Sequence, residues 1–166
     1  NKHKKEDKMN LDKYTIKSQE AIQKAQEIAL QNGHSQIENS HILKGILDSE
    51  ENLIPYLLQK LNVNQSHLSG ALDAIIMRLP KVSGGQIYLS QESSKMLLKA
   101  QDFLKEFGDE FVSVEHLLLS LYHQKDQVAQ LLKDSGIKDK QLKTTILEMR
   151  KGSKVDSPTN ESNFNA

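Results

Sequence analysis

Apolar side chains recur every three or four positions along most of the chain, which is the period of an amphipathic α-helix. The first such stripe lies between Thr15, whose hydroxyl can cap a helix, and Gly33, which can end one. It consists of Ala21, Ile22, Ala25, Ile28 and Ala29. A second stripe lies between Ser90 and Gly108 and consists of Met96, Leu97, Ala100, Phe103, Leu104 and Phe107. Both patterns predict helices that turn one face toward a core.

The two stripes belong to a duplicated unit. After each stripe a β-branched residue stands four positions before a histidine, and an aliphatic run follows, at Ile37–His41 and at Val112–His116. The second copy stands 75 residues after the first. The same offset joins Thr15 to Ser90, Ala21 to Met96, Ala25 to Ala100, Gln26 to Gln101 and Gly33 to Gly108. A register kept over so many positions indicates two copies of one helical unit.

Each unit is predicted to hold four helices. Glu38 and Ser113 stand where they can cap the second helices, and Pro55 fits the first turn of a third helix. Fourth helices are predicted over residues 64–79 and 139–150. The predicted fold is therefore all-α, with eight helices in two pseudo-symmetric four-helix repeats joined by a Pro/Gly linker.

Composition shifts mark the boundaries of these units, because the helical periodicity stops where Pro and paired Gly or a polar tract begins. In chain order the predicted segments are a disordered leader or cloning remnant (1–10), repeat one (11–80), a linker (81–88), repeat two (89–152) and a flexible linker leading out of the domain (153–166).

Charge and composition exclude several classes of function. Lys plus Arg and Asp plus Glu both number 22, so the chain carries no electrostatic footprint for nucleic acid or an anionic membrane. It has no cysteine, which excludes disulfides, thiol nucleophiles and thiolate metal sites. No apolar run approaches the roughly 20 residues of a membrane span, and no secretory signal is visible. We expect neither nucleic acid nor membrane as a partner.

Motifs for chemistry are also absent. The sequence lacks a phosphate-binding Gly-rich loop, a Gly-x-Ser-x-Gly elbow and a His-Glu-x-x-His zinc pair. His34 and His41 are seven residues apart, as are His116 and His123, but without matching carboxylates this spacing favours packing over metal ligation. A small helical enzyme using His41 and His116 is a minor alternative. Glu115 stands in the first turn of a predicted helix. Its negative charge there either stabilises the helix through the positive end of the helix dipole or contacts a partner.

Three stretches carry a resemblance to a known family. They are the opening Leu11-Asp12-Lys13-Tyr14-Thr15, the run from Val112 to Leu119, and the linker from Leu79 to Gly84. Together with the duplication they resemble the N-terminal domain of the ClpB-type AAA+ disaggregases over about residues 11–152. The linker points to ClpB rather than to the related ClpC and ClpA.

The resemblance implies a large cytoplasmic parent that forms a homohexamer and threads aggregated polypeptides through its pore with a DnaK-type co-chaperone system. ATP and Mg²⁺ would bind in later ATPase domains missing from this chain, so we expect no cofactor, no metal and no enzyme activity here. The implied role is to bind unfolded or aggregated polypeptide and present it to the ring. The alternatives are an adaptor-docking domain of ClpC or ClpA type and, less favoured, a structural spacer.

The resemblance also implies functional residues. A polar surface patch of the family maps onto Thr15, Asp109 and Glu115, whose residue types are retained. An apolar substrate groove maps onto Lys99, Phe103 and His116, of which only Phe103 is apolar.

Overall fold

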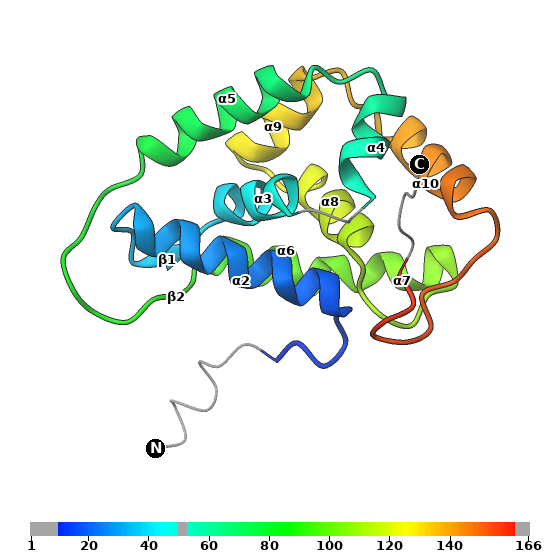
Figure 1. Cartoon of the computed structure of the whole chain (residues 1–166), viewed down its shortest axis with the longest axis horizontal. Helices are drawn as coiled ribbons and strands as arrows, with labels where there is room; N and C mark the ends of the chain where they lie inside the picture. Colours follow the sequence, from blue (N-terminus) through cyan, green and yellow to red (C-terminus); the bar gives the residue numbers. More distant parts are fainter. Residues whose placement is uncertain (1–9, 50–52, 162–166) are drawn as a thin grey trace.

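The computed structural model describes residues 10–49 and 53–161. The leader predicted for residues 1–10, apart from its last residue, and the end of the predicted C-terminal linker lie outside these ranges. Repeat one contains α2 (Ile16–Gln31), α3 (Asn39–Asp48), α4 (Ile54–Lys60) and α5 (Gln65–Met77). Repeat two contains α6 (Gln91–Ala100), α7 (Asp102–Phe107), α8 (Val114–Tyr122), α9 (Gln127–Asp134) and α10 (Asp139–Arg150) (Figure 1).

The prediction of two four-helix repeats in an all-α fold is confirmed over these ranges. α6 and α7 together occupy the single helix predicted between Ser90 and Gly108, and they meet at Gln101, which keeps helical backbone angles (φ −68°, ψ −23°). The predicted caps form as well. The side chains of Thr15 and Ser90 each accept a hydrogen bond from the backbone N–H three residues later. Gly108 ends α7 in the left-handed conformation.

Short parallel strand pairs, which the sequence did not predict, join the two repeats. Strand β1 (Gln36–Ile37) pairs with β2 (Tyr88–Leu89), and an isolated bridge joins Tyr14 to Val112. Leu89 stands 75 positions after Tyr14, and Val112 stands 75 positions after Ile37. Each repeat therefore pairs its entry residue with the residue before the second helix of the other repeat, and the two bridges are equivalent.

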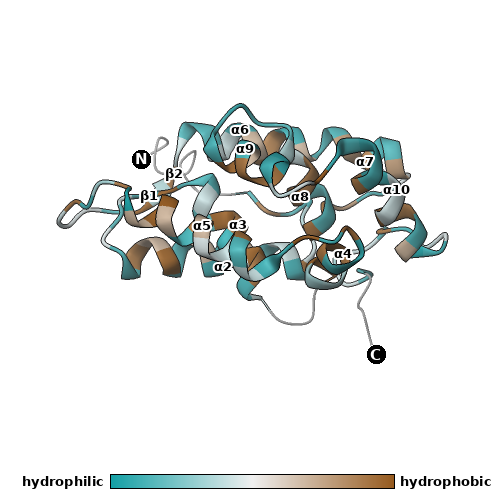
Figure 2. Cartoon of the chain, turned by 90° about the horizontal axis from the view of Figure 1, so that it is seen from above, coloured by the Kyte–Doolittle hydropathy of each residue, from teal (hydrophilic) through white to brown (hydrophobic). Residues whose placement is uncertain are grey.

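The last helix of each repeat also packs against the other repeat. α5, the last helix of repeat one, packs on α9, and α10, the last helix of repeat two, packs on the equivalent α4. The central helices α3 and α8 contact each other, and one continuous core contains apolar side chains of both repeats. In Figure 2 the hydrophobic stretches of the ribbon gather toward the interior, and much of the outer helical surface is hydrophilic. The duplication therefore builds one body rather than two units.

α2 and α3 approach each other closely at Gly45. A side-chain carbon at this position would lie 2.4 Å from the backbone oxygen of Ala21, so only glycine fits. The equivalent residue in repeat two is Ser120, whose hydroxyl donates a hydrogen bond of 2.6 Å to the carbonyl of Met96. Within the described ranges, none of the helices has both the length and the apolar character needed to cross a membrane.

Candidate functional site

His116 organises a buried polar cluster at the start of α8. Its Nδ1 accepts a hydrogen bond of 2.8 Å from the backbone N–H of Ser113, so Nδ1 carries no proton. The neutral ring therefore holds its proton on Nε2, which lies 2.8 Å from Oδ2 of Asp109 and donates to it. The ring is fully buried and stacks at a tilt on Phe107. His116 thus caps its own helix and orients a carboxylate of the preceding loop.

Arg150, the last residue of α10, brings the charges of this cluster together. Its Nη1 pairs with Asp109, and its Nε and Nη2 donate to Oε2 of Glu115 at 3.2 and 3.0 Å. All three residues are buried. Burial lowers the pKa of Arg150, but the charges and hydrogen bonds of the two carboxylates outweigh it and raise the pKa overall. One cation between two anions allows all three charges to be buried.

Asp109 is held in its ionised form. Burial would raise the pKa of its carboxyl, but hydrogen bonds from His116, from the Val155 N–H and from Arg150, with the charge of Arg150, bring that pKa below its ordinary value. The stability that this gives is present above the ordinary pKa of an aspartate and is lost as the pH falls through the lowered value.

The equivalent cluster in repeat one is uncharged. His41 accepts the N–H of Glu38 at Nδ1, and its Nε2 lies 2.9 Å from Nδ1 of His34, which occupies the position of Asp109. Burial, followed by the effect of His34, lowers the pKa of His41 to about 4. Ile76 stands where repeat two has Arg150, and Ser40 stands where it has Glu115.

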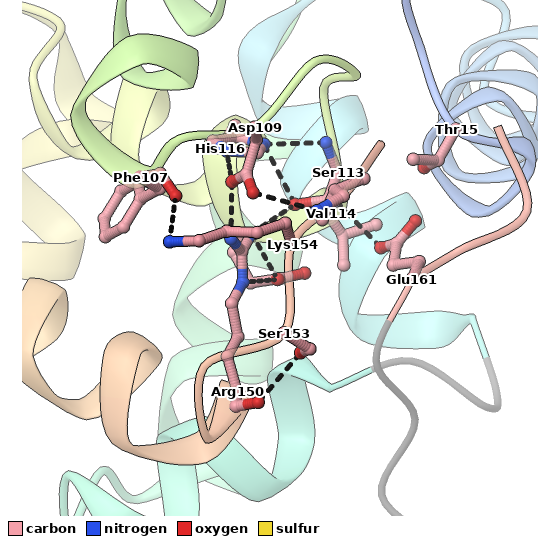
Figure 3. A network of polar contacts seen from close by, with 12 residues as sticks. Thr15, Phe107, Asp109, Ser113, Val114, His116, Arg150, Ser153, Lys154 and Glu161 are labelled. Carbon is pink, nitrogen blue, oxygen red and sulfur yellow. Dashed lines mark hydrogen bonds and ion pairs between the residues drawn. The ribbon is translucent and has the colours of Figure 1, made fainter. Parts of the chain in front are cut away.

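The C-terminal segment, residues 153–161, covers the charged cluster (Figure 3). Its Val155 N–H donates to Oδ1 of Asp109 at 2.9 Å, and its Glu161 accepts the N–H of Val114 at 3.0 Å. Thr15 lies above Glu161 in the same view. The segment was predicted to be a flexible linker, whereas its described residues pack on the domain.

The covering segment changes the expected character of the polar patch. Thr15, Asp109 and Glu115 lie in one region, as the resemblance implied, but they are 0%, 8% and 0% exposed. The expectation that they form an exposed surface is therefore wrong for this arrangement. The physical reason is that ion pairing with Arg150 and the C-terminal segment remove them from water. Their functional role stays a prediction.

The three residues of the predicted groove differ in their burial and surroundings. Lys99 is exposed on α6, and His116 is buried beside Asp109. Phe103 is 7% exposed, with the His123 ring at 5.5 Å and the ammonium of Lys143 over its face at 5.6 Å. Phe103 therefore belongs to the core and presents only an edge to solvent. The assignment of a groove to these residues stays a prediction.

Ser113, His116 and Asp109 are linked in the order of a hydrolase triad, with Ser113 Oγ 2.9 Å from His116 Nδ1. Nucleophilic catalysis requires the hydroxyl to reach a substrate. Ser113 and His116 are fully buried, and Nδ1 already accepts the Ser113 N–H. The arrangement is thus a helix cap. Among the described residues, no group of three or more His, Asp or Glu side chains could hold a metal ion.

Reasoning from the sequence missed Arg150 and Glu161. Arg150 could have been found from the duplication. Leu142 and Ile146 of its helix correspond to Leu68 and Leu72 of repeat one, and these four side chains form buried stripes. The next position in the stripe is the apolar Ile76 in repeat one but Arg150 in repeat two. An arginine in a core register requires buried anions as partners. Glu161 gave no signal, since it lies in a polar stretch without periodicity.

Comparison with known proteins decides the family. A sequence profile described as "Clp repeat (R) N-terminal domain" matches residues 13–165. The chain belongs to this family. This Clp N-terminal domain is 46% identical over 156 residues to Chaperone protein ClpB of Bacteroides thetaiotaomicron. The match covers 94% of the chain but 18% of that chaperone, so the chain spans under a fifth of its relative's length.

Solved structures support the fold. The Hsp104 N-terminal domain from Candida albicans superposes with a TM-score of 0.77 at 20% identity, over 90% of this chain and 99% of the other. A ClpV N-domain in complex with a VipB peptide superposes with a TM-score of 0.71 at 15% identity, over 88% and 94% of the two chains. At these identities the likeness shows the Clp N-domain fold alone.

Proposed function

We propose that this Clp N-terminal domain binds unfolded or aggregated polypeptide and presents it to the hexameric ring of a cytoplasmic, ATP-dependent disaggregase. The observation that carries the proposal is the 46% identity to a ClpB chaperone across nearly the whole domain. ATP binding and hydrolysis, and cooperation with a DnaK-type system, are assigned to the parent assembly. The domain contributes no catalytic step.

A further observation supports a role in binding peptides. A domain of the same fold, the ClpV N-domain, has been solved with a VipB peptide bound. Client binding by a single domain is expected to be weak, because association costs offset much of what a few hundred Å² of apolar burial contributes. Several such domains on one ring raise the effective concentration of weak sites.

The experiment for this function uses Lys99, because Phe103 is too deeply buried to be changed to a charge without unfolding the domain. Lys99 is exposed and lies four residues before Phe103 on the α6–α7 rod. If clients bind this face, Lys99→Leu should tighten binding of a permanently unfolded model protein roughly threefold to tenfold, since partial burial of a leucine contributes on the order of 1 kcal/mol. Isothermal titration or NMR titration measures the change.

Lys140→Leu is the matched control, because Lys140 is an exposed lysine on α10 and the change in composition is identical. Equal tightening by both variants would contradict the α6–α7 face. No binding of any unfolded protein by the parent chain would contradict the proposed function itself.

An adaptor-docking role, as in ClpC or ClpA, is the alternative. It predicts that affinity capture from lysate yields one dominant folded protein in stoichiometric amount. The proposed function predicts a diffuse set of proteins whose recovery rises after heat stress. Because relatives that are 46% and 40% identical to this chain are ClpB chaperones, the client-binding role is favoured.

A further inference from the structure

The C-terminal segment binds the domain as an extended peptide binds a receptor (Figure 3). The carbonyl of Val155 accepts the N–H groups of Glu110 and Phe111 at 2.8 and 3.2 Å, and its N–H donates to Asp109. Further along, the carbonyl of Pro158 accepts the N–H of Ile16 at 2.9 Å. Backbone hydrogen bonds of this kind give affinity without reading sequence, and side-chain pockets give selectivity.

Two side chains anchor the segment. Val155 is 2% exposed and Glu161 is 9% exposed, whereas Asp156 and the residues from Pro158 to Asn160 are exposed. The anchors stand six positions apart. The segment therefore presents a buried apolar residue and, at this distance, a buried carboxyl side chain, with exposed side chains at most positions between them.

The receptor surface is formed by two helix starts. Ile16 and Val114 are the first residues of α2 and α8, and their N–H groups have no partner inside those helices. The C-terminal segment supplies both acceptors, a carbonyl at Ile16 and the Glu161 carboxylate at Val114. A carboxylate at the start of α8 also lies at the positive end of the helix dipole.

Unpaired polar atoms buried where the segment meets the domain weaken its binding, so another peptide can replace it. Oε1 of Glu161, Oε1 of Glu115 and Nζ of Lys17 are buried without a hydrogen-bond partner among the described residues. Buried polar groups of this kind destabilise the closed arrangement relative to one in which water reaches them. The segment is thus held by a few backbone bonds, by the hydrogen bond of 3.0 Å from Lys154 Nζ to the carbonyl of Phe107, and by two anchors, against an electrostatic penalty.

Ionisation adds to that penalty. The pKa of Glu161 is raised to about 7, first by burial and then by the nearby charge of Glu115. The Thr15 side chain, the Val114 N–H and the charge of Lys17 act in the opposite direction and lower the pKa of Glu161. Docking is therefore strongest where Glu161 is protonated and weakens as the pH rises from the ordinary range of a glutamate to about 7.

Repeat one has the start of an equivalent segment but not its anchor. Lys81 and Val82 repeat Lys154 and Val155, and the Val82 N–H donates to the carbonyl of Gly33 at 2.9 Å. Val82 is 49% exposed, however, against 2% for Val155. The anchored segment is specific to repeat two.

We propose that the surface made by the first turns of α2 and α8 and the loop between α7 and α8 is a peptide-binding site. Its ligand class is an extended segment with an apolar residue and, six positions later, a carboxyl side chain. Residues 153–161 are the copy of this ligand that the chain itself supplies, and they exchange with a segment of the same class from another molecule. Under the proposed function, on which this last step rests, that molecule is an unfolded client.

The test uses the whole chain with both anchors changed, Val155→Asp/Glu161→Lys, and a fluorescent peptide with the sequence of residues 153–161. The peptide should bind this variant at least about tenfold more tightly than the parent chain, because the parent site is already occupied by a tethered ligand. A scrambled peptide should bind neither. Thr159→Lys is the control, since Thr159 is exposed and the change adds a lysine without removing an anchor.

Absence of peptide binding to a double variant with the helical circular dichroism of the parent overturns the inference. Should the double variant not fold, the same titration on Glu161→Ala, which removes the acceptor of the Val114 N–H, decides, and failure of the peptide to bind that folded variant also overturns it. If the peptide competes with an unfolded client for the chain, the proposed exchange with clients is supported; if client binding is unchanged by the peptide, that exchange is overturned.

If neither the unmodified chain nor any variant binds a client, the proposed function is contradicted. The peptide titration still tests the peptide-binding site in that case.

Discussion

The two histidine clusters, one in each repeat, have the same backbone and different chemistry. His41 and His116 both accept the N–H of the residue before their helix at 2.8 Å, and both present Nε2 to a side chain 2.9 or 2.8 Å away. In repeat one that side chain is the neutral His34. In repeat two it is Asp109, joined by Arg150 and Glu115.

The difference separates what the fold requires from what repeat two adds. Both repeats need a cap at the start of the second helix, followed by an aliphatic face that packs in the core. His41 forms this cap with the neutral His34, rather than a charged side chain, at its Nε2. The charged cluster is an addition, because buried ion pairs contribute little net stability compared with apolar packing. The charged cluster lies under the C-terminal segment, so its added chemistry is better explained by peptide binding in repeat two than by stability.

The largest expected effect comes from removing the cation of the charged cluster. Arg150→Met leaves two buried carboxylates unpaired, and we expect the free energy of unfolding to fall by about 3–5 kcal/mol. The matched change in repeat one, Ile76→Met, should lower it by less than about 1.5 kcal/mol. Urea denaturation followed by circular dichroism measures both. Adding Asp109→Asn and Glu115→Gln to Arg150→Met should restore part of the loss, and no recovery would contradict the charge argument.

The next effect concerns acid. Because the pKa of His41 is lowered to about 4, the unfolded chain binds a proton that the folded chain does not. Stability is therefore lost as the pH falls from about 6.5 to about 4, by no more than about 3–4 kcal/mol at 1.36 kcal/mol per pKa unit. His34→Asp gives repeat one the carboxylate of repeat two, so it should raise the pKa of His41 and reduce the loss. Histidine NMR titration checks the pKa; an unchanged value would show that His34 has no part in it.

The smallest effect compares the two caps. Thr15→Ala and Ser90→Ala each remove a side-chain acceptor at a helix start, and each should lower the free energy of unfolding by about 0.5–2 kcal/mol. Only Thr15→Ala should also disturb the C-terminal segment, since the next residue, Ile16, donates its N–H to the carbonyl of Pro158 in that segment. Amide hydrogen exchange at Val114 reports the segment. Equal exchange in both variants would mean that Thr15 serves as a cap alone.

The sequence predicted the helices well because their signals are local. Thr15, Ser90 and Pro55 act on the next turn of chain, and the stripes from Ala21 and Met96 need only the helical period. The duplication then supplied a long-range register.

The candidate site was predictable only in part. Residues such as Asp109 and Glu115 were found through the family resemblance, yet their burial depends on Arg150, 35 residues beyond Glu115, and on Glu161. Neither contact follows from a period or a cap. Side chains brought together by folding leave no local pattern, so an exposed patch was expected where a covered one exists.

The paired bridges at Tyr14–Val112 and Ile37–Leu89 have a consequence for how the domain is put together. In a twofold-symmetric homodimer the interface is isologous: when one element of the first copy contacts a second element of its partner, the equivalent contact is made with the two copies interchanged. The domain has the geometry of such a dimer joined into a single chain by the segment through Gly84 and Gly85. Half the sequence would expose the surface of its missing partner, so the covalent join makes assembly independent of protein concentration.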